Sequence, residues 1–341
     1  MKLSILDQAP LSSGRTARDA LEEAVRLAQA GEKFGYSRYW MAEHHDLPGL
    51  ACSAPEIMLS LIGGQTRSIR LGAGAILLPY YRPYKVAETF NLLSTLFPGR
   101  IDLGIARSPG GSAEVSIALA DRFLENVWKL PEAFEELLRF LDGNYPEDHP
   151  YARIAAAPIP SAPPEPWILG TSVKSAKLAA EQGVPYAFGH FMNTEHAEEA
   201  IRVYREQFRP LRSLQQPYVM LAVSAVCAET TEQARAVALS SYAWRRQLAQ
   251  GSAPAQGLPS IAEAERMLQG EDQADLLRRM QTSAAIGQPG EVGARLKAWS
   301  RTYEADELLI MSYAHDFEHR LRSYDLIARE LIAEGQEAAF S

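Results

Sequence analysis

The sequence predicts an α/β fold, a (β/α)8 TIM barrel with insertions on its rim. Short apolar runs with strand character alternate with longer segments of helical period, which is the order that a parallel sheet with crossover helices requires. The strand-like runs number eight, and eight β/α units favour a closed barrel over an open sheet. The fingerprint GxGxxG of open nucleotide-binding sheets is also missing after the first strand.

The strand-like runs extend from the N-terminus almost to the last helical segment. The predicted strands are Lys2–Asp7, Ser37–Ala42, Ile69–Leu78, Arg100–Ala106, Pro166–Gly170, Tyr186–Gly189, Tyr218–Ala225 and Asp306–Met311. Because α/β barrels of this length commonly fold as one unit, we expect residues 1–341 to form a single domain.

The helical segments carry start and stop signals. Thr16, with Asp19 three residues on, is a good cap for the first helix, and Gly35 ends it. Pro83 suits the first turn of the helix after the third strand. Asp316 is a good cap for the last helix. Apolar residues recur on one face of each helix, so each must pack on the sheet.

Two stretches do not fit the simple repeat. Residues 143–165 are rich in proline, and residues 249–285 read as a loop followed by helical sequence. Long insertions in barrels usually lie on the rim and shape a site, so we expect both to contribute to substrate binding. A surface elaboration is an equal alternative for the second.

Composition excludes several classes of partner. Lysine and arginine total 34 against 42 acidic residues, a formal net charge of -8, which argues against nucleic-acid or anionic-membrane binding. Cys52 and Cys227 are too few and too far apart for a disulfide framework or a zinc module. The N-terminus enters an apolar strand at Leu3 without a basic leader, and no apolar run is long enough to cross a bilayer. We expect a cytoplasmic protein.

The second strand ends in a run of ionisable side chains, Glu43, His44, His45 and Asp46. Active sites of such barrels are built from strand ends and the loops that follow them. Adjacent side chains of an extended chain point to opposite faces, which argues against a metal shared by the two histidines. The position favours one histidine as an acid or base near neutral pH, although a structural pair is the alternative.

Two later strand ends resemble parts of an anion site. Arg107 precedes a glycine-containing loop, and a guanidinium beside glycines can hold a phosphate. The run from Gly170 through Thr171, Ser172 and Ser175 places hydroxyls and free amides at a helix start. An ordinary helix cap is equally common for either serine taken alone.

Three further segments are open to two interpretations. The small residues 72–75 of the third strand fit either a flat ligand close to the backbone or tight packing inside the barrel. His190 and Phe191 after the sixth strand, and residues 312–315 after the last, can contact a ring system or a substrate, or can fill the rim.

Five fragments, in this order, resemble bacterial luciferase-like monooxygenases, the flavin-dependent oxidoreductases related to the luciferase α chain. They are AEHH at 42–45, LGAGAILLPYYRPYKVAE from 71, PGRIDLGIAR ending at Arg107, LGTSVKSAKLAAEQGVP from 169 and the closing ADELLIMSYAHDFEHRLRSYDLIA. The resemblance spans most of the chain and implies the barrel fold.

The resemblance also implies roles for individual positions. His44 matches the family's catalytic histidine, which assists proton transfer around the flavin and its peroxide, and the peptide between Gly74 and Ala75 is expected to be cis beneath the isoalloxazine ring. The positions expected to bind the cofactor are Gly74, Ala75, Arg107, Gly170, Thr171, Ser172 and Ser175. Those expected to face the substrate are Glu43, His190 and Phe191.

The implied reaction uses reduced FMN and O2 to oxygenate a small organic substrate through a C4a-peroxyflavin. The reduced flavin is expected from a separate flavin reductase, since no pyridine-nucleotide fingerprint is evident, and a homodimer is expected by analogy. Luciferase has a cysteine, a carboxylate and a tryptophan at the positions of Ala106, Thr171 and His190, which argues against light emission here.

Three alternatives remain open. A deazaflavin (F420)-dependent hydride-transfer oxidoreductase shares the fold, because barrel relatives use both cofactors. A non-catalytic flavin-binding protein would keep the fold without turnover. A metal-dependent barrel hydrolase is the third. The substrate is not fixed by any of these, because a fold does not determine its substrate.

Overall fold

The computed structural model describes residues 1–250 and 257–333, and its parallel strands close into a barrel. The barrel strands are β1 (Lys2–Asp7), β2 (Arg38–Met41), β3 (Arg70–Leu77), β4 (Ile101–Ala106), β5 (Glu165–Gly170), β6 (Tyr186–Gly189), β7 (Val219–Cys227) and β9 (Glu307–Met311). Strand β9 pairs with both β1 and β7, and β6 also pairs with β7, so the sheet has no free edge among these strands. The predicted (β/α)8 fold is confirmed.

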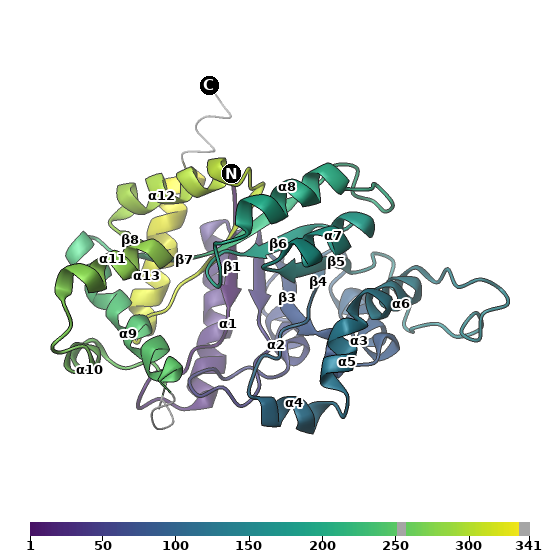
Figure 1. The fold of residues 1–341 in the computed structure, drawn as a ribbon, viewed down its shortest axis with the longest axis horizontal. Helices are drawn as coiled ribbons and strands as arrows, with labels where there is room; N and C mark the ends of the chain where they lie inside the picture. Colours follow the sequence, from purple (N-terminus) through teal and green to yellow (C-terminus); the bar gives the residue numbers. More distant parts are fainter. Residues whose placement is uncertain (251–256, 334–341) are drawn as a thin grey trace.

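Helices surround the strands on the outside of the barrel (Figure 1). They are α1 (Ala17–Phe34), α2 (Pro55–Gly63), α3 (Pro83–Leu96), α4 (Ala113–Leu119), α5 (Phe123–Trp128), α6 (Leu130–Asp142), α7 (Val173–Glu181), α8 (Ala197–Gln207), α9 (Thr231–Ala249), α10 (Ile261–Met267), α11 (Gln273–Ser283), α12 (Pro289–Thr302) and α13 (Phe317–Ala328), with short turns η1 (Leu78–Tyr80) and η2 (Arg329–Ala333). Within the described ranges, no helix is long and apolar enough to cross a bilayer.

The predicted helix boundaries are confirmed by their capping contacts. Thr16 and Asp19 form a reciprocal capping box at α1, and Gly35 ends that helix with a φ of 87°. Asp316 accepts hydrogen bonds from the first free backbone N–H groups of α13. Pro83 is the first residue of α3.

A short strand that the sequence did not reveal lies outside the closed barrel. Strand β8 (Ala285–Gly287) pairs with the end of β7 at residues 225–227. It ends the second insertion, whose helical part is α10 and α11. The N–H of Leu258 donates to the carbonyl of Leu11 at 2.8 Å, which ties this insertion to the loop after β1 on the carboxyl rim. Residues 251–256 of the insertion lie outside the described residues.

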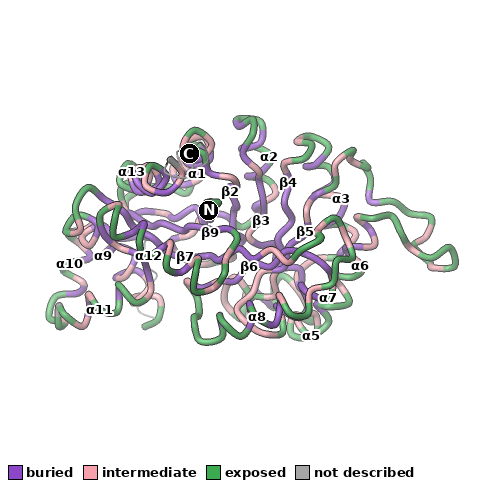
Figure 2. The backbone as a smooth tube through the Cα atoms, turned by 90° about the horizontal axis from the view of Figure 1, so that it is seen from above, coloured by how far each residue is buried: buried purple, intermediate pink, exposed green. Residues whose placement is uncertain are grey.

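The first insertion does not lie on that rim. Residues 143–164 lead from α6 into the start of β5 and therefore join the opposite end of the barrel. They pack along α3, where the Asn91 amide donates to the carbonyl of Ala156 at 2.7 Å and the Tyr84 hydroxyl to that of Ala155 at 3.1 Å. The segment extends sideways from α6 (Figure 1) and is largely exposed (Figure 2).

The amino end of the barrel interior is filled by a network of buried charges. The Arg38 guanidinium lies 2.8 Å from Asp102, 3.2 Å from Glu307 and 3.2 Å from Glu165. Asp102 and Glu307 are fully buried. Burial opposes ionisation of Asp102, but Arg38 and Arg70 hold its pKa below the usual value. The charges therefore depend on one another, because each would be costly alone in the interior.

We predict that Arg38→Met destabilises the fold by about 3–5 kcal/mol, because it leaves buried carboxylates without their partner. The measurement is the free energy of unfolding from urea denaturation. Arg18→Gln is the control, since Arg18 pairs with Glu22 on the surface with a side chain 86% exposed. We expect that control to remain within about 0.5 kcal/mol of the natural chain. Equal urea midpoints for the natural chain and Arg38→Met would contradict a stabilising role of the network.

Candidate active site

A cavity of about 670 Å³ opens at the carboxyl ends of the barrel strands. Its deep wall is built largely from small residues at strand ends, and its outer part is formed by α5 and α7. The sequence-predicted residues on its wall are Glu43, His44, Gly74, Ala75, Arg107, Gly170, Thr171, Ser172, Ser175 and Phe191. Residues separated by up to 148 positions in sequence are thus brought to one hollow, as expected for parallel strands that end on the same side.

His44 lines this cavity, and one nitrogen of its imidazole ring has no hydrogen-bond partner. Its backbone N–H donates to the carbonyl of Cys52 at 3.0 Å, which fixes the chain after β2, while Nδ1 has no hydrogen-bond partner. Burial, with a smaller effect of His45, lowers the pKa of His44 to about 4. The imidazole is therefore neutral near neutral pH, and its exchange of a proton with a group in the cavity stays a prediction.

Glu43 is engaged by the protein on several sides. Its Oε1 accepts hydrogen bonds from the Tyr81 hydroxyl at 2.7 Å and from His45 Nε2 at 2.7 Å, and its Oε2 accepts from the backbone N–H of Leu77 at 2.9 Å. These bonds join the end of β2 to the end of β3. A direct contact between Glu43 and a substrate stays a prediction.

The predicted anion site is assembled around the start of α7. Ser172 and Ser175 form a reciprocal capping box, and Arg107 Nη2 donates to Ser172 Oγ at 3.4 Å. A Cβ added at Gly170 would lie 2.3 Å from Ser175 Oγ, so glycine is needed for this approach. The serines therefore act as a helix cap and also lie beside a guanidinium at the positive end of a helix, which is a favourable place for a phosphate.

Two residues of β3 that line the cavity, Gly74 and Ala75, have no large side chain. The peptide bond between Gly74 and Ala75 is cis, as expected, and the register of β3 against β4 shifts between Ala73 and Ile76. A Cβ added at Gly74 would lie 3.0 Å from side-chain atoms of Leu6 and Trp40. Packing against these side chains therefore requires glycine at position 74, in line with the second interpretation of this segment. Gly74 and Ala75 also line the cavity without a large side chain, and contact with a flat ligand stays a prediction.

His190 does not lie on the cavity wall. Its ring packs against Trp299 of α12 at 5.0 Å and against Tyr303, directly after α12, at 5.2 Å, and its side chain is buried. The next residue, Phe191, lines the cavity. The chain leaves β6 here with neighbouring side chains on opposite sides, so only one of the two faces the cavity. The position of His190 does not support the expected contact with substrate.

Several wall residues were not found from the sequence. Gln8 follows β1 directly and its side chain accepts a hydrogen bond from Tyr313; the rule that strand ends build the site would have identified it. Trp128 and Lys174 line the outer part, with the ammonium 5.2 Å from the indole ring, and no local pattern pointed to them. Conversely, no residue of 143–165 is on the wall, which corrects the expectation that this insertion shapes the site.

A family model described as luciferase-like monooxygenase matches residues 1–304. The chain belongs to the luciferase-like monooxygenase family. It is 42% identical to the uncharacterized protein YceB of Bacillus subtilis (strain 168), over 96% of this chain and 98% of that one. It is 35% identical to the N-acetyl-S-alkylcysteine monooxygenase of the same organism, over 98% and 99%. The crystal structure of apo-MsnO8 matches with a TM-score of 0.88 at 34% identity, over 97% and 98%.

More distant structures show the same fold with two kinds of cofactor. The oxygenating constituent of 3,6-diketocamphane monooxygenase from Pseudomonas putida, in complex with FMN, has a TM-score of 0.74 at 19% identity, over 98% of each chain. An F420-dependent secondary alcohol dehydrogenase has a TM-score of 0.68 at 15% identity, over 97% and 99%. At these identities the likeness concerns the fold alone, while membership of this family supports a flavin-type cofactor.

The metal-hydrolase alternative has no geometric support. In the part of the chain that the structure describes, no group of three or more histidine, cysteine, aspartate or glutamate side chains is arranged to hold a metal ion. His45 Nε2 is bonded to Glu43 Oε1 at 2.7 Å.

We predict that His190 makes stability depend on pH below neutrality. Burial, with a smaller contribution from Arg295, lowers its pKa from 6.5 to about 4, so between these values the unfolded chain binds a proton that the folded chain does not. The free energy of unfolding must then rise as pH increases from about 4 to 6.5.

The test compares the natural chain with His190→Gln by urea denaturation across this pH range. The free energy of unfolding of the variant should rise less steeply with pH, because the variant lacks the imidazole whose pKa is lowered in the folded chain. His196→Gln, at an exposed position, is the control and should keep the natural slope. Parallel slopes for all three chains would refute the assignment to His190.

Proposed function

We propose that this chain is an FMN-dependent monooxygenase that uses reduced FMN and O2 to oxygenate a small organic substrate. One observation carries the proposal: Arg107 and Ser172, which suit a phosphate, line the same cavity as Gly74 and Ala75, whose small side chains suit the ring of one flavin mononucleotide. The family of the chain and its similarity to a monooxygenase of Bacillus subtilis support the reaction type.

The residues present fit this cofactor. Gly170 leaves the space in which the Ser175 hydroxyl lies, and the Nδ1 atom of His44 is buried without a partner. Arg107 would bind the phosphate by charge-assisted hydrogen bonds, and Thr171 and Ser172 would border it. Reduced FMN would supply the electrons that activate O2. The protein would orient the reactants, exclude water and exchange a proton at His44.

The substrate and the partners are part of the proposal. The similar Bacillus subtilis enzyme acts on N-acetyl-S-alkylcysteine, so thioethers of N-acetylcysteine are the first substrates to test. We infer that a separate reductase supplies the reduced flavin, in a cytoplasmic setting. We also infer a homodimer, supported by Ile57 and Leu61 of α2 and Leu92 and Leu96 of α3, which are at least half exposed on adjacent helices.

We predict that Arg107→Ala weakens binding of reduced FMN by about 1.5–3 kcal/mol, because it removes charged hydrogen bonds to the phosphate. Binding of reduced riboflavin, which has no phosphate, should stay unchanged. Anaerobic fluorescence titration measures the affinities for reduced FMN and for reduced riboflavin. Arg18→Ala, at an exposed position of α1, is the control. Tighter binding of a reduced deazaflavin than of FMN by the natural chain would overturn the FMN assignment in favour of hydride transfer.

We predict that His44→Ala slows oxygenation by about 10²–10⁴-fold, because the proton-exchanging imidazole is lost. FMN affinity should change little, since His44 is not part of the anion site. Stopped-flow absorbance follows re-oxidation of bound reduced FMN by O2, and product analysis follows sulfoxide formed from a thioether. Unchanged re-oxidation and product yield would favour the non-catalytic flavin-binding alternative.

A further inference from the structure

The cavity extends past the predicted anion site into an outer part between α5 and α7. Lys174, Lys177 and Glu181 of α7 line one side, and Trp128 of α5 lines the other. The three α7 positions are spaced by three and four residues, so they lie on one face of the helix. Lys174 belongs to the first turn, two residues after Ser172. Because helical side chains lean toward the N-terminus of their helix, Lys174 leans toward the end at which the serine hydroxyls lie.

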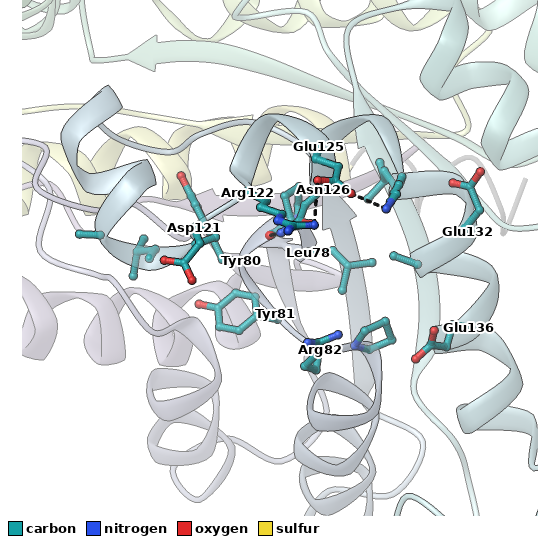
Figure 3. Close-up of a pocket in the computed structure, with 18 residues that line it drawn as sticks. Leu78, Tyr80, Tyr81, Arg82, Asp121, Arg122, Glu125, Asn126, Glu132 and Glu136 are labelled. Carbon is teal, nitrogen blue, oxygen red and sulfur yellow. Dashed lines mark hydrogen bonds and ion pairs between the residues drawn. The ribbon is translucent and has the colours of Figure 1, made fainter. Parts of the chain in front are cut away.

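The opposite side of α5 anchors the helix that carries Trp128. The Asn126 amide donates to the carbonyl of Pro79 at 2.8 Å, and the ring of Phe123 stacks on Tyr80 with ring centres 4.9 Å apart. The contact of Asn126 with Pro79 faces a second hollow, an outer groove of about 690 Å³ between η1, α5 and α6 (Figure 3). Helix α5 thus stands between the two hollows. Trp128 lines the cavity although it is 74% exposed, so burial alone does not explain its place.

The cations of the two hollows differ in their partners. In the outer groove, Arg122 and Lys129 both pair with Glu125 of the same helix (Figure 3). In the cavity, Lys174 has no carboxylate partner among the residues that the structure describes, and its ammonium lies 5.2 Å from the centre of the Trp128 ring. An aromatic face attracts a cation without neutralising it, so the ammonium keeps its full charge for an anion.

The start of α7 therefore gathers positive charge that no acidic residue offsets locally. Arg107 donates to a neutral group, the hydroxyl of Ser172. The first turn of α7 contains no acidic residue, and a helix start is itself positive. For the same reason, a lysine in this turn is unfavourable for the helix alone. Two full charges beside a helix start favour an anion that carries more than one negative charge.

We propose that Lys174, held over the Trp128 ring, is a second cation of the phosphate site and selects a phosphate monoester over a phosphodiester. The inference rests on the proposed function, in which Arg107 binds the phosphate of FMN. A monoester carries a charge of about −1.5 to −2 at pH 7, which two cations balance, whereas a diester carries a single negative charge. The deazaflavin F420 carries its phosphate as a diester, so the same cation also favours FMN over F420.

Five variants separate a positioned cation from a general effect of charge. Lys174→Gln removes the charge, and Lys174→Arg keeps it. Lys177→Gln removes the same charge from the same face of α7, one turn further from the helix start, and is the matched control. Trp128→Leu removes the aromatic face that holds the ammonium, and Trp128→Phe keeps such a face.

The experiment compares two ligands that differ by one charge, reduced FMN and the methyl ester of its phosphate. Anaerobic fluorescence titration gives both affinities for each chain, and the natural chain should bind FMN more tightly than the ester. Lys174→Gln should lower this preference by about three- to tenfold, because a charged contact at an exposed position is lost. Trp128→Leu should lower it less, whereas Lys174→Arg, Trp128→Phe and Lys177→Gln should keep it.

Two results of this titration would overturn the assignment. The first is an unchanged preference in Lys174→Gln. The second is an equal loss in Lys174→Gln and Lys177→Gln, which would show a general effect of charge rather than a positioned cation. A natural preference in Trp128→Leu would contradict the part assigned to the ring.

A second measurement needs no flavin. Phenyl phosphate and methyl phenyl phosphate differ by the same single charge, and phosphorus NMR line widths report their binding. The natural chain should prefer phenyl phosphate, and Lys174→Gln should lose part of that preference. If the natural chain does not bind reduced FMN, the proposed function falls, and phenyl phosphate still tests Lys174. If the natural chain binds reduced FMN and its methyl ester equally, the proposed function stands and the role of Lys174 falls.

Discussion

Closure of the sheet, with β9 paired to both β1 and β7, is the constraint on which the other features depend. It forces the inward side chains into one confined space with two different ends. At the amino end the space is filled by Trp40, Trp167 and the charges around Arg38. At the carboxyl end several inward positions are small, among them Ala42 and Ala222, although Leu6 and Leu309 also line the cavity that remains. The hollow exists because large residues occupy only one end of a closed barrel.

The anion site shows how one group of atoms can meet two requirements. The first N–H groups of a helix need acceptors, and Ser172 with Ser175 supplies them in the absence of a ligand. The same helix end is positive, and Arg107 adds a full charge beside it. The cap keeps the site ordered, and the charge makes it favourable for an anion. The helix-cap interpretation of these serines is confirmed, and their part in binding an anion stays a prediction.

The sequence was sufficient to predict the architecture, because hydrophobic period and capping residues are local signals. It was also sufficient to place residues that directly follow a strand, such as His44 and Arg107, at the carboxyl-end cavity. It did not reveal β8, whose three residues carry too little pattern, nor the burial of His190, which depends on Trp299 from a distant helix. The location of residues 143–165 at the amino end follows from their place before β5, so the predicted order of elements was enough to exclude them from the carboxyl rim; their packing along α3 was not predictable from a local pattern.

The alternation of an extended chain explains why three consecutive residues after β2 have different roles. Glu43 and His45, two positions apart, bond to each other, whereas His44 between them lines the cavity and has a buried Nδ1 without a hydrogen-bond partner. The outer pair also anchors the surroundings, since the His45 N–H donates to the carbonyl of Gly110 at 2.8 Å and Glu43 accepts from Leu77. The neighbours of His44 thus tie β2 to the loops after β3 and β4 and use their own polar groups in doing so. What remains is the imidazole of His44, whose backbone is fixed by the carbonyl of Cys52 and whose ring nitrogen Nδ1 is not used by the protein.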